Sequence, residues 1–211
     1  MAPRHERRQT TPDPSEGSDF VTITVPSGKK FAAHAHLLAY HSEYFRRALK
    51  SPSQEAATRN FDMSEWATAK TVSCFIRWIY LDTVTADFDS PWCPPEDEDM
   101  IKCWLFGDYI QAKGFRNHLM RVTFSTALTV QFGAIHEMWD QIPSNSELRP
   151  FLVNIYCRDL ILEGDMVDGP CRLEVTPPTL LLEVSKRLAA VLGDPAHGPG
   201  LFQFSLKQHL E

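Results

Sequence analysis

The sequence has no long apolar run, and it lacks the patterns typical of secreted or membrane-spanning proteins. No stretch approaches the roughly 20 consecutive apolar residues that a membrane-spanning helix needs. The first residues carry charges with no apolar run behind them, so a secretory signal is not expected. The five cysteines, an odd number, show no Cys-x-x-Cys pairing. These absences predict an intracellular protein, cytoplasmic or nuclear, with free thiols and no membrane partner.

Clustered positive charge is also scarce. The chain has 21 Lys and Arg against 27 Asp and Glu, which gives a formal net charge of -6. Nucleic-acid binding depends on grouped Lys and Arg that contact phosphates. The one basic group in the sequence is Arg4, Arg7 and Arg8, in a polar stretch typical of a solvated terminus. We therefore expect no nucleic-acid partner.

Motifs for catalysis or metal binding are missing as well. There is no Gly-x-Ser-x-Gly and no glycine-rich phosphate loop. His34, His36 and His41 are close in sequence, but no cysteine is near them, and zinc needs about four ligands. The acidic run 96–99 lacks the central glycine of a calcium loop. We expect no enzyme, cofactor or metal; for the alternative, an enzyme of unknown class, no residue can be nominated.

Regular structure is predicted to begin at Asp19. Residues 1–18 are polar and rich in Pro, Ser and Thr, which is typical of a disordered tail. Residues 20–25 alternate and are β-branched, and residues 30–34 resume this pattern after a Pro-Ser-Gly-Lys turn. This order predicts a β-hairpin.

Helical spacing replaces the alternation from His36 onward. Two short helices are expected, divided at Ser42, which can cap the second one. An extended piece at about 58–63 precedes a helix expected from Glu65 to about Tyr80, with Ser64 as its N-cap. The residues predicted to face inward on this helix are Trp66, Ala69, Val72, Ile76, Ile79 and Tyr80.

The second half of the chain is predicted to be helical after an irregular acidic loop at 82–99. A helix is expected from Met100 and is predicted to end at Lys113-Gly114. Further helices are expected from near Phe115, at 135–139, at 146–162, and from Thr176-Pro177-Pro178 to Gly193. The fold class is therefore α+β, a small sheet flanked by a cluster of helices with additional C-terminal helices.

Residues 19 to about 120 resemble the BTB/POZ domain. The resemblance is carried by Phe31-Ala-Ala-His34 and by residues 37–45, which together are similar to the family signature F-x-x-H-K-x-x-L-x-x-x-S-x-Y-F. Residues 75–80 and 105–119 resemble later helices of the family. The positions that the resemblance implies for the fold signature are Asp19, Phe31, His34, Leu38, Ser42 and Phe45.

The resemblance also implies a division of the chain. Residues 19–122 would form the BTB/POZ domain, and residues 123–193 a helical extension like that of short fungal-type BTB proteins. Residues 1–18 and 194–211 would be flexible tails.

The function implied is that of a non-enzymatic scaffold that binds other proteins and mediates homo- or hetero-oligomerisation, with a homodimer as one form. The alternative is a substrate adaptor for a cullin-3 ubiquitin ligase. Family members that recruit cullin-3 often carry an apolar-x-Glu triplet after the second helix, and this triplet falls on Ala48-Leu49-Lys50. Lysine in place of glutamate reverses a charge, which disfavours that contact. The residues expected to bind protein are Tyr44, Ala48, Leu49, Lys50 and Trp92; Trp92 either anchors a partner or packs its loop back onto the domain.

Overall fold

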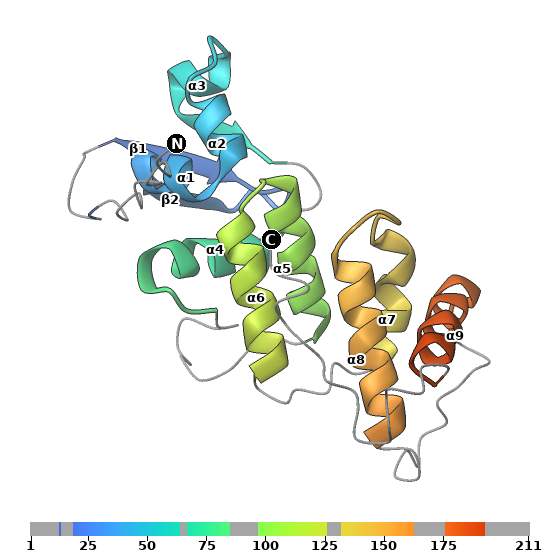
Figure 1. Ribbon diagram of the computed structural model, residues 1–211. Helices are drawn as coiled ribbons and strands as arrows, with labels where there is room; N and C mark the ends of the chain where they lie inside the picture. The colour runs from blue at the N-terminus through green and yellow to red at the C-terminus, as the bar shows by residue number, and fades with distance from the viewer. Residues whose placement is uncertain are drawn as a thin grey trace, which may run out of the picture.

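The structure is a computed structural model, and it describes residues 13, 19–63, 67–84, 97–125, 132–162 and 176–192. Figure 1 shows a small sheet with short helices, a central group of longer helices beside it, and a third group farther along the chain. The expected tails, apart from Asp13, lie outside the described residues, as do Ser64, Trp66 and Trp92.

The sheet has three strands in the order β2-β1-β3. β1 (Phe20–Thr24) pairs antiparallel with β2 (Lys30–His34) and parallel with β3 (Asn60–Asp62). The predicted hairpin is confirmed. Gly28 occupies its turn with φ +80°, a conformation that glycine adopts at no steric cost. Ile23 is fully buried and opposite Phe31 and Phe61, so one face of the sheet packs on the helices.

Three short helices lie between β2 and β3 in the chain. α1 (Ala35–His41) and α2 (Glu43–Ala48) are divided at Ser42, as predicted, because the Ser42 side chain accepts a hydrogen bond from the Phe45 backbone N–H. α3 (Gln54–Thr58) was not predicted. Ser53, the last residue of the Ser-Pro-Ser stretch after α2, caps it by accepting from the backbone N–H of Ala56.

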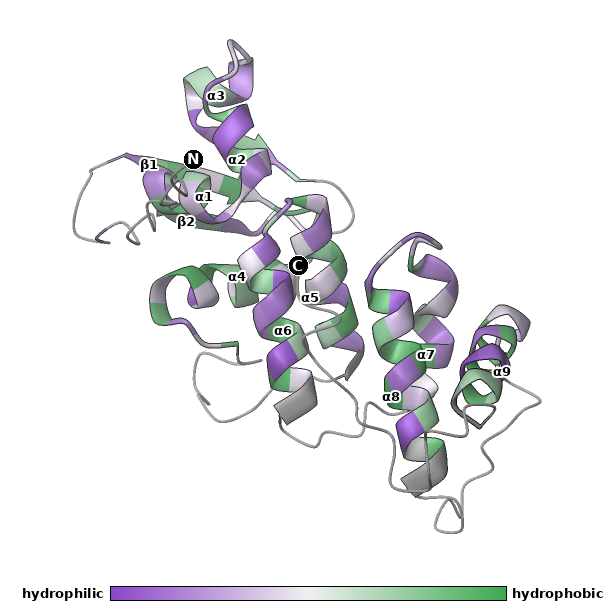
Figure 2. Ribbon diagram, viewed as in Figure 1, coloured by the Kyte–Doolittle hydropathy of each residue, from purple (hydrophilic) through white to green (hydrophobic). Residues whose placement is uncertain are grey.

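The central group consists of α4 (Ala69–Leu81), α5 (Asp97–Tyr109) and α6 (Lys113–Ser125). The prediction that α4 begins at Glu65 is wrong, because Ala67 and Thr68 are not helical and Thr68 is the N-cap. Its predicted inward residues Val72 and Ile79 are buried, but so are Phe75 and Trp78, whereas Ile76 and Tyr80 are only half-buried. Figure 2 shows hydrophobic residues on several sides of the central helices.

The connection between α5 and α6 corrects a second prediction. Lys113-Gly114 does not end α5 but begins α6. The chain turns instead at Gln111, whose φ is 53°, and the Ala112 backbone N–H then donates to the Gly107 carbonyl over 2.8 Å. α5 also begins at Asp97, inside the stretch that the sequence placed in an acidic loop.

The third group contains α7 (Phe132–Met138), the short 3-10 helix η1 (Trp139–Gln141), α8 (Leu148–Leu162) and α9 (Pro178–Leu192). These elements agree with the predicted C-terminal helices. α8 is buried along most of its length and packs on α9. Buried side chains form one continuous core from the sheet to α9. Among the described residues, no helix combines the length and apolar content that crossing a membrane requires.

Candidate interaction surfaces

His34 joins the hairpin to the central helices. Its Nδ1 lies 2.5 Å from the hydroxyl oxygen of Tyr80, and its backbone N–H donates to the same oxygen over 3.0 Å. The ring of His34 also lies 4.3 Å from that of Phe20, measured between centroids. These contacts connect β2 to the end of α4, so His34 has a structural role beside an exposed aromatic ring.

The other positions of the fold signature lie inside the domain or at its joints. Ser42 is 1% exposed and donates to the Ile110 carbonyl over 2.6 Å, which fixes the start of α2 against the α5–α6 connection. The Asp19 carbonyl accepts from the backbone N–H of Ala35. Phe31 is partly buried, and Leu38 and Phe45 are completely buried. These residues therefore stabilise the fold and do not themselves form an exposed binding surface.

Four of the five expected protein-binding residues lie in α2 or directly after it. We define the α2 surface as Tyr44, Ala48, Leu49, Lys50 and Tyr109. Ala48 and Leu49 pack partly against the core, whereas Lys50 is exposed. Tyr109, 38% exposed, was missed by the sequence, and its ring lies 5.7 Å from that of Tyr44. Burial, with smaller contributions from Tyr109 and Glu55, raises the pKa of Tyr44 to about 12, so the Tyr44 phenol stays neutral.

A second surface, which the sequence did not indicate, spans the hairpin and α1. We define the α1 surface as Phe20, His34, His36 and Tyr40. Phe20 is 53% exposed and Tyr40 36% exposed. The His34 and His36 rings lie 5.4 Å apart, and His36 and Tyr40 are one helical turn apart on the same side of α1. Exposed aromatic side chains thus gather where β2, an edge strand, runs into α1.

Two histidines beside the Trp78 ring, His41 and His118, are disposed by burial to remain neutral. His41 packs edge-on against Trp78 at 4.8 Å, and within the described part of the chain its buried Nε2 has no hydrogen-bond partner. Burial lowers the pKa of His41, and the charge of Asp82 opposes this shift. Burial likewise lowers the pKa of His118, again against the effect of Asp82.

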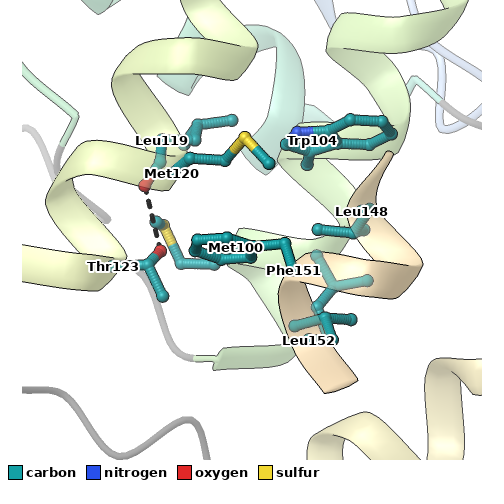
Figure 3. Close-up of a pocket in the computed structure, with 9 residues that line it drawn as sticks. Met100, Trp104, Leu119, Met120, Thr123, Leu148, Phe151 and Leu152 are labelled. Atoms are coloured by element: carbon teal, nitrogen blue, oxygen red, sulfur yellow. Dashed lines mark hydrogen bonds between the residues drawn. The ribbon is translucent and has the colours of Figure 1, made fainter. Parts of the chain in front are cut away.

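The apolar cavity between α5, α6 and α8 is too small to hold an organic ligand. Figure 3 shows side chains of α5, α6 and α8, among them Met100, Trp104 and Phe151, around an apolar cavity of about 20 Å³. A cavity of this size holds about one water molecule. No group of three or more His, Cys, Asp or Glu among the described residues could hold a metal ion.

The buried thiols offer no nucleophile. Cys74 and Cys103 are buried, and the hydrogen bond that Cys103 makes to Cys74, together with burial, raises the pKa of Cys103 well above its ordinary value. A thiol reacts as its thiolate, which such surroundings disfavour.

Comparison with known families agrees with the fold. A model of the BTB/POZ domain matches residues 13–119, about half of the chain, which includes the sheet and most of the chain up to α6. The match does not extend to α7, α8 and α9. A comparison with curated proteins found no match.

Proposed function

The chain belongs to the BTB/POZ domain family, and from this premise we propose that it is a non-enzymatic scaffold that self-associates through the α1 surface. BTB/POZ domains are protein–protein interaction modules. The observation that carries the proposal is the exposure of Phe20 and Tyr40, both aromatic, on the α1 surface. Aromatic side chains are enriched where interfaces are fully desolvated, because each buries a large area at little entropic cost.

The form of the α1 surface suits a two-fold contact. Both Phe20 and Tyr40 belong to regular elements, so they are held in place before association and lose little freedom on binding. In a symmetric dimer the same patch meets itself, so each aromatic ring buried by one protomer is matched by its copy. A stable contact of this kind buries on the order of 1,200–2,000 Å² in total, so the interface would extend beyond these four side chains.

Light scattering coupled to size exclusion tests the proposal. We expect the native chain to elute with twice its 24.0 kDa mass. The double variant Phe20→Ser, Tyr40→Ser should elute as a monomer with an unchanged circular dichroism spectrum. Leu182→Ser is the matched control, because Leu182 is 54% exposed on α9, outside the α1 surface. A native chain that stays monomeric at about 100 µM, the range of weak but specific contacts, would overturn the proposal.

A second candidate function is recruitment of cullin-3 through the α2 surface. The exposed ring of Tyr109 beside Tyr44 favours it, because it supplies an aromatic anchor next to the expected triplet. Exposed Lys50 opposes it. Pull-down with the N-terminal region of cullin-3 tests this role: binding lost in Tyr109→Ala and retained in Phe20→Ser would support it, and no binding by the native chain would eliminate it.

We also propose that the chain divides into a domain at 19–122 and a helical extension at 123–193. Leu148 and Phe151 of α8 line the small cavity together with Met100 and Trp104 of α5. The extension therefore shares buried surface with the domain, and we expect the chain to unfold in a single transition.

A further inference from the structure

The chain has four Ser-Pro or Thr-Pro dipeptides, and two of them lie among the described residues. Ser51-Pro52 lies between α2 and α3, and both of its residues are exposed. Thr176-Pro177 lies before α9; Thr176 is 6% exposed, and its hydroxyl oxygen lies 3.3 Å from Nε2 of His136. Proline-directed protein kinases accept a serine or threonine that is followed by proline, a residue that needs no partner for a backbone N–H. The fold thus presents one of these two hydroxyl groups to solvent and buries the other.

The loop that carries Ser51 leaves its hydroxyl group accessible. Residues 49–53 are not helical, and Ser51 and both of its neighbours are exposed. The Ser51 backbone N–H donates to the Ala48 carbonyl over 3.1 Å, whereas its hydroxyl group has no hydrogen-bond partner among the described residues. Ser53 differs, because its hydroxyl group caps α3 and no proline follows it. Of these two serines, Ser51 alone combines an accessible hydroxyl group with a following proline.

α3 offers little resistance to the extended conformation that a kinase requires of its substrate. It has five residues, and none of them is buried. Helical segments of this length are marginal in water, and segments with few buried contacts open at a small cost in free energy. The residues that follow Ser51 can therefore enter the substrate cleft of a kinase while the core stays folded.

The part of α2 that leads to Ser51 carries clustered positive charge. Arg46 and Arg47 both pair with the Glu43 carboxylate, so two guanidinium groups share one anion. Lys50, directly before Ser51, is exposed. A phosphate group on serine adds about two negative charges and is stabilised by nearby cations. Its attachment to Ser51 would reverse the sign of the charge that Lys50 brings to the α2 surface.

We propose that Ser51 is a phosphorylation site for a proline-directed protein kinase, and that its phosphate changes the charge of the α2 surface. The Ser51 Oγ forms a bond to the γ-phosphorus of ATP while the bond from this phosphorus to the bridging oxygen breaks, so ADP leaves and the hydroxyl proton passes to the base of the kinase. The α2 surface then has two charge states, cationic at Lys50 in the unmodified chain and anionic after phosphoryl transfer. This inference does not depend on self-association through the α1 surface.

Treatment of the full chain with a purified mitogen-activated protein kinase and MgATP tests the inference, and mass spectrometry of the tryptic fragment 51–59 locates the phosphoryl group. We expect modification of Ser51 in the native chain and none of this fragment in Ser51→Ala. Ser53→Ala is the matched control and should retain the modification. Pro52→Ala should slow the reaction at Ser51 by about tenfold or more, because the kinase loses its contact with the proline ring. Thr176 should stay unmodified, because it is buried in the folded chain.

A synthetic peptide of residues 47–57 serves as the reference without tertiary structure. If the kinase modifies Ser51 in the peptide but not in the native chain, the fold shields this hydroxyl group and the proposal is overturned. If it modifies Ser51 in neither, the kinase does not recognise the sequence, and the proposal is overturned equally. Circular dichroism verifies that the variants fold, and if Pro52→Ala does not, Ser51→Ala decides. The oligomeric state of the native chain, measured separately, has no bearing on these outcomes.

Discussion

The guanidinium of Arg149 lies over the indole ring of Trp139, with its central carbon 4.4 Å from the ring centroid. Two of its nitrogens donate to the Ile142 carbonyl over 3.0 and 2.9 Å, and Nη1 pairs with Glu183 over 3.2 Å. Trp139 in turn donates from Nε1 to the Thr179 hydroxyl over 3.0 Å. One side chain at the start of α8 thus holds η1 and α9 in place, and the third helical group depends on it.

Arg149→Met is expected to lower the free energy of unfolding by about 3 kcal/mol, because it leaves a buried carbonyl and Glu183 without their donor. Urea denaturation followed by tryptophan fluorescence measures this change. Arg121→Met is the matched control, since Arg121 is exposed on α6; its loss should stay within about 0.5 kcal/mol. Equal losses for the two variants would contradict the role given to Arg149.

Ser42→Ala tests the joint between α1, α2 and the α5–α6 connection. Ser42 accepts from the Phe45 backbone N–H and donates to the Ile110 carbonyl while almost fully buried. We expect a loss of about 2 kcal/mol, since the variant removes a helix cap and leaves a buried carbonyl without that donor. Ser53→Ala removes a comparable cap from the exposed end of α3 and should cost about half as much. A larger loss for Ser53→Ala would contradict this account.

The fold was predictable wherever it depends on neighbours in sequence. The hairpin follows from a turn built of Pro-Ser-Gly-Lys, and the division at Ser42 follows from a side chain that caps a backbone N–H three residues away. α4 shows where periodicity fails. It packs against β2, α1 and α5, so residues such as Phe75 and Trp78 are buried outside the predicted stripe.

The α1 surface could not be predicted because it is assembled by tertiary contacts. Phe20 and Tyr40 come from different elements, and the sequence gives no reason to place them on one surface. Tyr109 joins the α2 surface only because the α5–α6 connection docks on Ser42. Gly114 was assigned to a helix end, yet it lies within α6, where a Cβ would approach the Trp78 ring to 3.1 Å. The close packing of the Trp78 ring against the α6 backbone therefore explains the glycine at this position better than helix termination does.

Gly107→Ala tests the crossing of α5 and α6. A Cβ at Gly107 would lie 3.0 Å from Cδ1 of Phe115 and 3.0 Å from Cγ of Arg116. Phe115 is fully buried, so we expect overpacking to cost about 1–3 kcal/mol. Gly133 in α7 has open space around it, and Gly133→Ala should add about 0.5 kcal/mol by restricting the unfolded chain. Urea denaturation of both variants should give opposite signs; the same sign in both would contradict the account.

Stability should also depend on pH through His41. Burial lowers its pKa from the ordinary value of 6.5, so the unfolded chain takes up this proton at a higher pH than the folded chain does. The stability that neutral His41 contributes is fully present above about pH 6.5 and is lost as the pH falls from there toward the lowered pKa of the folded state. The melting temperature should therefore fall between pH 7.5 and pH 5.5.

His41→Gln removes the titrating group and should make this fall shallower. The comparison belongs in the Phe20→Ser, Tyr40→Ser background, where the proposed self-association cannot contribute to the measured stability. Differential scanning calorimetry at several pH values gives the slope in each chain. Burial lowers the pKa of His118 as well, and this histidine remains in both chains, so part of the slope should persist. A slope that His41→Gln leaves unchanged would mean that the Nε2 beside Trp78 finds a proton acceptor, such as a water molecule, in solution.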